Sequence, residues 1–175
     1  MSDLQCAATI VVARHGEAEY DVDAWPDAGG SLTALGRSQA RALGESLRDR
    51  RIATVWSSDL ARAVQTAEIA AGILRLDVRV RTPLREFGVG RPDETADDLF
   101  ARVSGELEAL ADLGRGETAL VISHGGAIEY TVPRLAANVG ADFDGGEPIG
   151  NCVTCELSAD ADGWVLRTWQ GVPIA

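Results

Sequence analysis

The sequence predicts an α/β protein, a three-layer α/β/α sandwich with a mostly parallel central sheet and an antiparallel edge. Short apolar segments rich in β-branched residues alternate with longer segments of helical periodicity between residues 7 and 135. Two alternating segments separated by a turn at 160–163 then close the chain as a hairpin. The chain has 175 residues and 46% hydrophobic content, so we expect one domain over 1–175 with one core.

The first expected strand ends in two chemically distinctive residues. An apolar run at 9–13 is followed at once by Arg14 and His15. A buried parallel strand there would place both at its carboxyl end, the edge where open α/β sheets bind ligands. The same order recurs where an apolar strand at 118–123 is followed by His124. These are the only two histidines of the chain, and we expect both imidazoles to emerge on one side of the sheet.

The elements between these two strands follow from caps and apolar stripes. Thr33 is expected to cap a helix with a basic exit, whose buried stripe comprises Leu35, Gln39, Leu43 and Leu47. A strand at 54–57 then leads through a tight turn into a helix capped by Ser58 or Asp59, whose apolar face includes Leu60, Ala63, Val64, Ala67 and Ala71.

Arg62 stands in the first turn of that second helix, where the helix dipole disfavours a cation. A bound anion would reverse this effect, because it would receive backbone N–H groups, the dipole and the guanidinium together. The formal net charge is -11, so an anionic substrate needs a local basic cluster against the field of the whole protein. We therefore favour an anion-binding role for Arg62.

The second half of the chain begins with an edge strand at 78–81 and a long connection over 82–94. Loops of this length in compact domains are often functional, and this one offers the carboxylates of Glu86, Asp93 and Glu94. Thr95 is expected to cap a helix with a stripe of Leu99, Val103, Leu107 and Leu110. After the second histidine strand, Gly125 and Gly126 open a helix that Pro133 should kink or end.

Charge and cysteine usage exclude several classes of function. The sequence pI is about 4.5, so we expect neither nucleic acid nor an anionic membrane as a partner. Three cysteines are too few for a disulfide scaffold, and the first apolar run is about half a membrane span long, which together favour the cytoplasm. Cys152 and Cys155 lie in a strand pattern that puts their sulfurs on opposite faces, which disfavours zinc or redox chemistry. The sequence leaves a homodimer open.

Two histidines, two arginines and a carboxylate at one sheet edge fit phosphoryl transfer best. A metal site is disfavoured because neither His15 nor His124 has a paired ligand at i+4. A serine-hydrolase triad is disfavoured because Ser123 adjoins His124 and the Gly-x-Ser-x-Gly elbow is absent. Phosphoryl transfer spreads negative charge over the equatorial oxygens of its transition state, which fixed cations and N–H donors stabilise. Arg14, Arg62 and the second histidine supply such donors, which leaves His15 as the nucleophile.

The motifs resemble those of the histidine phosphatase superfamily, which has the phosphoglycerate mutase-like fold. They run in family order and comprise Arg14-His15-Gly16, Leu32-Thr33-x-x-Gly36-x-x-Gln39-Ala40, Ser57-Ser58-x-Leu60-x-Arg62-Ala63-x-Gln65-Thr66-Ala67, Leu84-x-Glu86 and Val121-x-Ser123-His124-Gly125-Gly126. The combination of the first and third motifs is highly specific.

This resemblance implies a reaction without a metal or an organic cofactor, in which His15 attacks phosphorus and water hydrolyses the resulting phosphohistidine. It implies substrate contacts at Arg14, Gly16, Asp21, Arg62, His124 and Gly125. Asp21 stands where relatives usually carry a phosphate-contacting amide, and a carboxylate there repels phosphate unless it is protonated or turned away. Glu86 is the implied general acid and base. Glu94 and Asp21 are the alternatives, because Glu86 lacks the residues that usually follow the acid in relatives.

Hydrolysis of a small-molecule phosphomonoester is the function we expect. A phosphoglycerate-type mutase is disfavoured because family mutases carry extra segments that close over the substrate. A phosphohistidine-protein phosphatase is disfavoured if Glu86 occupies the acid position, and a non-catalytic phosphate-binding module is disfavoured by the intact set of His15, Arg62 and His124. The acidic composition favours monophosphates with neutral or cationic remainders over polyphosphates.

Overall fold

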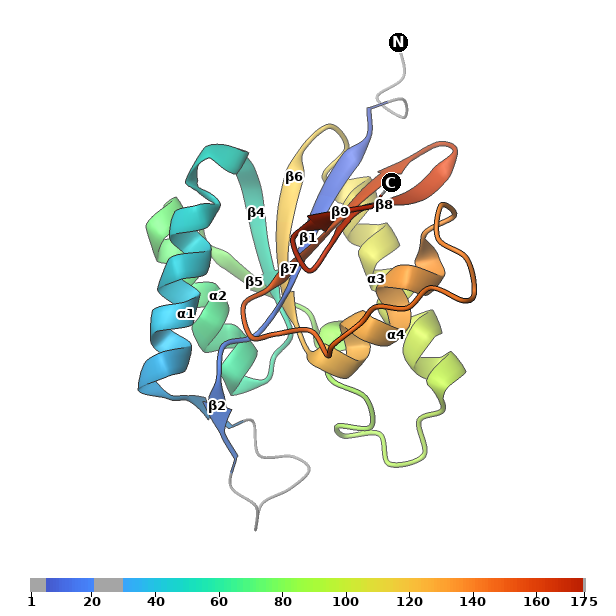
Figure 1. Cartoon of the computed structure of the whole chain (residues 1–175). Helices are drawn as coiled ribbons and strands as arrows, with labels where there is room; N and C mark the ends of the chain where they lie inside the picture. The colour runs from blue at the N-terminus through green and yellow to red at the C-terminus, as the bar shows by residue number, and fades with distance from the viewer. Residues whose placement is uncertain (1–5, 21–29, 175) are drawn as a thin grey trace.

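The computed structural model of the protein describes residues 6–20 and 30–174. In this part of the chain, seven strands form one sheet in the order β5-β4-β6-β1-β7-β8-β9. Two short strands, β2 (Ala18–Glu19) and β3 (Ser31–Leu32), form a separate pair. Figure 1 shows the large sheet between two helical layers, so the predicted three-layer α/β/α architecture is confirmed.

Four neighbouring strands are parallel, and the rest of the sheet is antiparallel. The parallel strands are β5 (Val78–Val80), β4 (Ile52–Ser57), β6 (Thr118–Ser123) and β1 (Ala8–Arg14). The antiparallel edge consists of β7 (Thr154–Asp160), β8 (Gly163–Trp169) and β9 (Val172–Pro173). Strands β1 and β6 end in register, with Arg14 opposite Ser123, so the residues that follow them leave the sheet at one edge.

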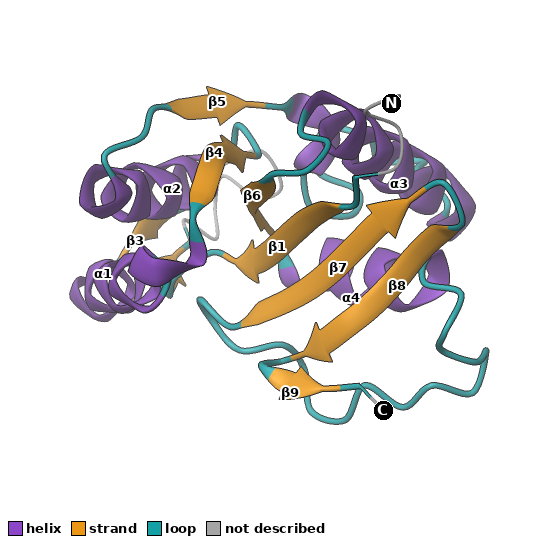
Figure 2. Ribbon diagram, turned by 90° about the horizontal axis from the view of Figure 1, so that it is seen from above, coloured by secondary structure: helices purple, strands orange, loops and turns teal. Residues whose placement is uncertain are grey.

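Two helices of the described chain cover each face of the sheet (Figures 1 and 2). One layer holds α1 (Ala34–Ser46) and α2 (Ala61–Leu74), and the other holds α3 (Ala96–Leu113) and α4 (Gly125–Leu135). Short 3-10 turns follow at η3 (Arg48–Arg50) and η4 (Thr82–Leu84). Strand β1 serves both layers because its side chains alternate: Val11 and Ala13 pack with α1 and α2, whereas Ile10 and Val12 pack with α3 and α4.

The predicted caps hold at α1 and α3. Thr33 Oγ1 accepts a hydrogen bond from the Gly36 amide at 3.0 Å, and Thr95 takes part in a capping box. The predicted α1 stripe is wrong at Leu35, which is 53% exposed. The first turn of α1 buries Gly36 instead, because the backbone of Glu17 crosses there: a Cβ at Gly36 would lie 2.0 Å from the Glu17 carbonyl oxygen.

Three other local predictions are confirmed. Strand β5 lies at the edge of the sheet, and α4 ends two residues after Pro133. Cys152 packs against the α1–α2 layer and Cys155 against the α3–α4 layer, so the two sulfurs face opposite ways. The hairpin begins at Thr154 rather than at Cys152, whose φ of 58° takes it out of the strand. No helix among the described residues combines the length and apolarity that crossing a membrane requires.

Candidate active site

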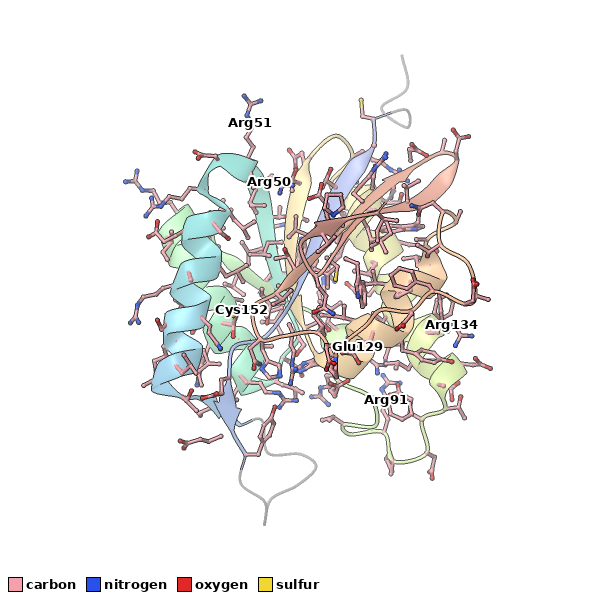
Figure 3. The ribbon with its side chains drawn as sticks, in the orientation of Figure 1. Arg50, Arg51, Arg91, Glu129, Arg134 and Cys152 are labelled. Atoms are coloured by element: carbon pink, nitrogen blue, oxygen red, sulfur yellow. The ribbon has the colours of Figure 1, made fainter. Side chains whose placement is uncertain are left out.

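Three parallel strands deliver the predicted site residues to one edge of the sheet. His15 follows β1, His124 follows β6, and Arg62 lies in the first turn of α2, after β4. The two imidazole rings lie 5.2 Å apart between centroids, with their planes at 60°, so the prediction that both emerge at one edge is confirmed. Arg50 and Arg51, at the exit of α1, lie at the opposite end of the molecule (Figure 3). They therefore add no donor to this site.

His15 is held as a neutral imidazole whose Nε2 atom carries no proton. The residue is 2% exposed, its Nδ1 lies 2.7 Å from the Gly16 carbonyl oxygen, and Arg62 Nε donates to its Nε2 at 3.1 Å. A carbonyl oxygen only accepts and a guanidinium only donates, so Nδ1 carries the proton and Nε2 the lone pair. Burial lowers the pKa of His15 from 6.5 to about 4, helped by the charges of Arg62 and Arg14 and opposed by the Gly16 hydrogen bond. At neutral pH this imidazole is therefore uncharged, and its Nε2 keeps a lone pair.

His124 lies beside it, fully buried at the start of α4. Its Nε2 is 2.6 Å from Ser58 Oγ, and its Nδ1 has no hydrogen-bond partner among the described residues. Burial lowers the pKa of His124 well below 6.5, and the nearby positive charge of Arg62 acts in the same direction. The ring is therefore neutral at physiological pH. Its buried Nδ1 has no hydrogen-bond partner among the described residues.

Arg14 is anchored by one nitrogen and leaves another without a partner. Its Nη1 donates to the Ile149 carbonyl oxygen at 2.7 Å, whereas its buried Nε has no partner within the described chain. Gly125 packs closely here, because a Cβ on it would lie 3.5 Å from Arg14 Nε. Buried polar atoms in native proteins are almost always hydrogen-bonded. The Arg14 Nε and the His124 Nδ1 are therefore two candidate contacts for a polar ligand at this edge.

The Glu86 carboxylate lies at the N-terminus of α4. It accepts hydrogen bonds from the amides of Ala127 at 2.9 Å and Gly126 at 3.2 Å. The approach is close: a Cβ at Gly126 would lie 2.8 Å from Glu86 Oε1, so a larger residue there would displace the carboxylate. Burial lowers the pKa of Arg62, and the negative charge of Glu86 is one of the influences that oppose this shift. The predicted acid is therefore at the same edge as the predicted nucleophile.

The arrangement suits an anion with a reactive centre in front of His15 Nε2. A buried guanidinium, a second arginine and a second imidazole surround that atom. Among the described residues, no group of three or more His, Cys, Asp or Glu side chains could hold a metal ion. Fixed cationic and N–H donors around a nucleophile are the features that stabilise a phosphoryl-transfer transition state.

Comparison with protein families agrees with this geometry. The model of the histidine phosphatase superfamily (branch 1) matches residues 10–94 and 91–171. The chain belongs to the histidine phosphatase superfamily. Members of this superfamily are phosphatases or mutases.

Individual relatives cover almost the whole chain. Phosphoglycerate mutase-like protein 4 of Arabidopsis thaliana is 30% identical over 94% of this chain and 86% of its own length. The probable phosphoglycerate mutase GpmB of Salmonella arizonae is 26% identical over 91% and 89%. Among solved structures, a mycobacterial glucosyl-3-phosphoglycerate phosphatase has a TM-score of 0.77 at 25% identity, covering 94% of this chain and 99% of its own. These similarities thus cover at least 91% of the chain.

Not every predicted substrate contact points at the site. The Gly16 amide donates to Thr66 Oγ1 at 3.0 Å, so it is already occupied. Gly16 instead permits close packing, because a Cβ on it would lie 2.6 Å from the Gly36 carbonyl oxygen. Asp21 lies outside the described residues, and its role stays a prediction. Glu94, an alternative acid, forms a buried ion pair with Arg102 at 2.7 Å, whereas the Glu86 carboxylate lies at the start of α4.

The cap predicted for α2 is wrong. The N-cap residue is Leu60, which makes no side-chain capping bond. Ser58 turns instead to His124, and Asp59 forms a two-pronged ion pair with Arg85 at 2.7 and 2.6 Å. Both polar side chains are thus used to join α2 to the other parts of the site, which a local capping rule does not anticipate.

The loop that carries Glu86 is held by a buried arginine. Arg102 of α3 donates to both oxygens of Glu94 and also to the carbonyl oxygens of Pro83 at 2.6 Å and Arg85 at 3.0 Å. The side chains of Arg102 and Glu94 are only 7% and 2% exposed. These bonds tie both ends of the loop to α3, so they fix where Glu86 approaches α4.

One supporting residue had no signal in the sequence. Asn151 Nδ2 donates to the His15 carbonyl oxygen at 2.8 Å, and the next amide, of Cys152, donates to the Arg14 carbonyl oxygen at 2.9 Å. The segment before β7 therefore supports both catalytic candidates from 135 or more positions away. Thr66 was visible in the sequence, because it stands in the motif around Arg62, but its bond to the Gly16 amide was not.

Proposed function

We propose that the protein is a metal-independent phosphatase that hydrolyses a small-molecule phosphomonoester through a phosphohistidine on His15. The observation that carries this proposal is the state of His15: an unprotonated Nε2, fixed by the Gly16 carbonyl at Nδ1 and faced by Arg62 Nε at 3.1 Å. A low pKa of about 4 keeps this nitrogen nucleophilic at neutral pH.

In the first half-reaction, His15 Nε2 forms a bond to phosphorus while the bond from phosphorus to the ester oxygen breaks. The leaving oxygen takes a proton from Glu86. In this structure the Glu86 carboxylate accepts from amides at the start of α4, whereas a general acid must carry a proton. Glu86 therefore exchanges at least one of these bonds for the leaving oxygen when substrate binds.

In the second half-reaction, water attacks the phosphohistidine. The bond between Nε2 and phosphorus breaks, Glu86 accepts the proton of the water, and inorganic phosphate leaves. Arg14, Arg62 and His124 surround the phosphoryl oxygens throughout, and the unpartnered Arg14 Nε and His124 Nδ1 supply positions for them. No step in this scheme uses a group beyond the chain, the substrate and water.

A mutase is the second candidate, because the relatives from Arabidopsis thaliana and Salmonella arizonae are named phosphoglycerate mutase-like and probable phosphoglycerate mutase. A mutase returns the phosphoryl group to a substrate hydroxyl, whereas a phosphatase gives it to water. Substrate identity and water access decide between them.

Steady-state hydrolysis of p-nitrophenyl phosphate in EDTA tests the phosphatase, and mass spectrometry of the quenched enzyme locates the phosphate. We expect turnover in EDTA and phosphate on His15. A panel of phosphorylated metabolites, with phosphate release and phosphoglycerate isomerisation measured side by side, separates the two candidates. Absence of phosphate from His15 in a turning-over enzyme contradicts the mechanism.

A further inference from the structure

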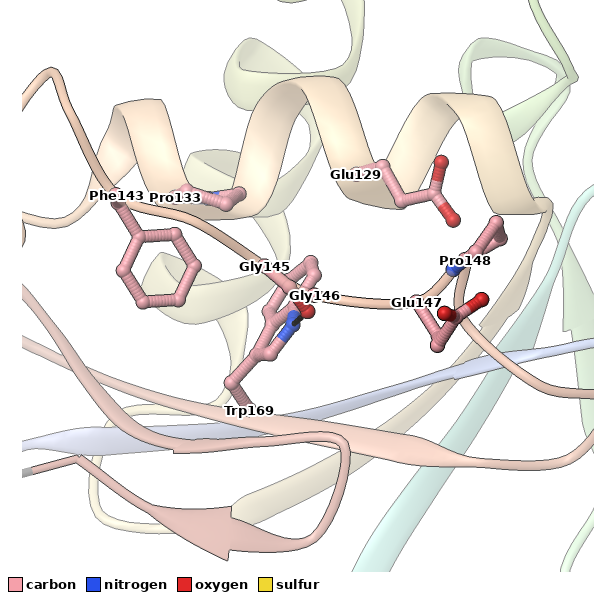
Figure 4. Close-up of a pocket in the computed structure, with 8 residues that line it drawn as sticks. All are labelled: Glu129, Pro133, Phe143, Gly145, Gly146, Glu147, Pro148 and Trp169. Atoms are coloured by element: carbon pink, nitrogen blue, oxygen red, sulfur yellow. Dashed lines mark hydrogen bonds between the residues drawn. The ribbon is translucent and has the colours of Figure 1, made fainter.

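A small cavity lies between α4, β8 and residues 143–148 of the loop that leads from α4 to β7. Its volume is about 250 Å³, and its lining combines the rings of Phe143 and Trp169 with the carboxylates of Glu129 and Glu147. Figure 4 shows the two carboxylates flanking Pro148 at one end of the cavity and the aromatic pair at the other. The two rings meet edge to face, 5.7 Å apart between centroids. Residues from three separate segments thus converge on this space.

Two N–H donors of the cavity wall, on Trp169 and Ile149, are already hydrogen-bonded within the protein. Trp169 Nε1 donates to the Gly145 carbonyl oxygen at 2.7 Å, and the Ile149 amide donates to Glu129 Oε1 at 2.7 Å. None of the described residues that line the cavity is Lys, Arg or His. The charged side chains of this lining are therefore both carboxylates, Glu129 and Glu147, and both residues are exposed. Such a lining disfavours an anion and favours a ligand that brings positive charge and N–H or methyl-ammonium groups.

The cavity is connected to the phosphate site through one residue. The Ile149 amide binds Glu129, and the Ile149 carbonyl oxygen accepts from Arg14 Nη1 at 2.7 Å. Glu129 also lies one helical turn after Gly125, the residue that packs against Arg14. One residue, Ile149, therefore separates Glu129 in the cavity wall from Arg14 of the candidate active site, an arrangement that suits a molecule with an ammonium group near a phosphate.

We propose that this cavity binds a small organic ammonium ion, either a protonated primary amine or a quaternary ammonium. Its charge is paired by Glu129 and Glu147, and its alkyl groups pack on Phe143 and Trp169 by apolar and cation–π contact. The cavity is smaller than the ~300–1,000 Å³ of drug-sized sites, so the ligand is of head-group size. Two sources share this chemistry. The ammonium belongs to the alcohol part of the phosphomonoester, a case that depends on the proposed phosphatase function, or to a free amine that binds beside the substrate.

The first experiment compares two substrates of the same shape. Phosphocholine carries the quaternary ammonium, and 3,3-dimethylbutyl phosphate replaces its nitrogen with carbon. If the ammonium belongs to the substrate, kcat/KM should be about tenfold higher for phosphocholine. One partly exposed ion pair and one cation–π contact together contribute about that factor. Glu147→Gln should reduce that ratio to about threefold or less. The matched control is Glu68→Gln, a glutamate exposed on α2 away from the cavity, which should keep the ratio.

The second experiment measures binding without turnover. Choline chloride is titrated into the whole protein by calorimetry at constant ionic strength, with sodium chloride as the reference. Choline binding that Glu147→Gln weakens, combined with equal kcat/KM for the two esters, assigns the cavity to a free amine. Equal kcat/KM together with no choline binding overturns the proposal while leaving the phosphatase intact. Failure of every ester, including p-nitrophenyl phosphate, removes the proposed function, and the choline titration then decides the cavity by itself.

Discussion

Replacing Arg62 with alanine should lower activity and also change its pH dependence. Arg62 is 4% exposed, and its guanidinium donates to His15 Nε2 at 3.1 Å, where the proposed reaction would develop charge on the phosphoryl oxygens. Loss of one preorganised donor of this kind costs about 3 kcal/mol of transition-state stabilisation, a fall of roughly 10²–10³ in kcat/KM. The same change removes one of the positive charges that lower the pKa of His15.

The pH profile separates these two effects. His15 must be neutral to attack phosphorus, so kcat/KM in the wild-type protein rises with pH through the His15 pKa of about 4. In Arg62→Ala the His15 pKa moves up, because a repelling charge is gone and water enters the space, so the acid limb shifts to higher pH.

Profiles of kcat/KM for p-nitrophenyl phosphate between about pH 4 and 8 measure both quantities. Arg37→Ala, an exposed arginine of α1, is the matched control and should change neither. An acid limb that stays in place or moves to lower pH in Arg62→Ala would refute the reasoning about His15. A loss of less than about threefold would refute the assignment of Arg62 as a transition-state donor.

Four further predictions follow from the site. His15→Ala should abolish turnover and leave no phosphoenzyme detectable by mass spectrometry, and residual phosphate on the variant would contradict the assignment. As pH drops from 6.5 to about 4, His15 should contribute about 3 kcal/mol to a fall in the free energy of unfolding, because the unfolded chain binds a proton there that the folded chain does not; buried His124 adds to the fall, and urea unfolding should show a smaller fall in His15→Gln. Glu94→Gln should destabilise the protein by about 3 kcal/mol, because it leaves Arg102 buried without its counter-charge; a change under about 1 kcal/mol in thermal or urea unfolding would argue against a tight pair. Gly126→Ala should lower kcat while the protein stays folded by circular dichroism, because a Cβ there lies 2.8 Å from Glu86 Oε1 and displaces the carboxylate from the Gly126 and Ala127 amides; unchanged kcat would mean that activity does not depend on these amides holding Glu86.

The sequence alone was sufficient to predict that His15, His124 and Arg62 meet at one edge of the sheet. Apolar runs before Arg14 and before His124 predict parallel strands, and parallel neighbours must release their following residues at one edge. Arg62 was found in the same way, since a cation in the first turn of a helix needs an explanation. These inferences use only the order of residues along the chain. The parallel register of β1, β6 and β4 then brings those residues to one edge of the sheet.

The supports of the site depended on tertiary structure. Ser58 looked like a helix cap, yet it bonds to His124, 66 positions away, because β4 and β6 are neighbours in the sheet. Glu94 looked like an alternative acid, yet both of its carboxylate oxygens are bound by Arg102 in a buried ion pair. Asn151 carries no local signal at all, and only the return of the chain beside β1 brings it to the His15 carbonyl. Periodicity and caps report on neighbours within one element, whereas the partner of a buried polar group is chosen by packing between elements that are far apart in the sequence.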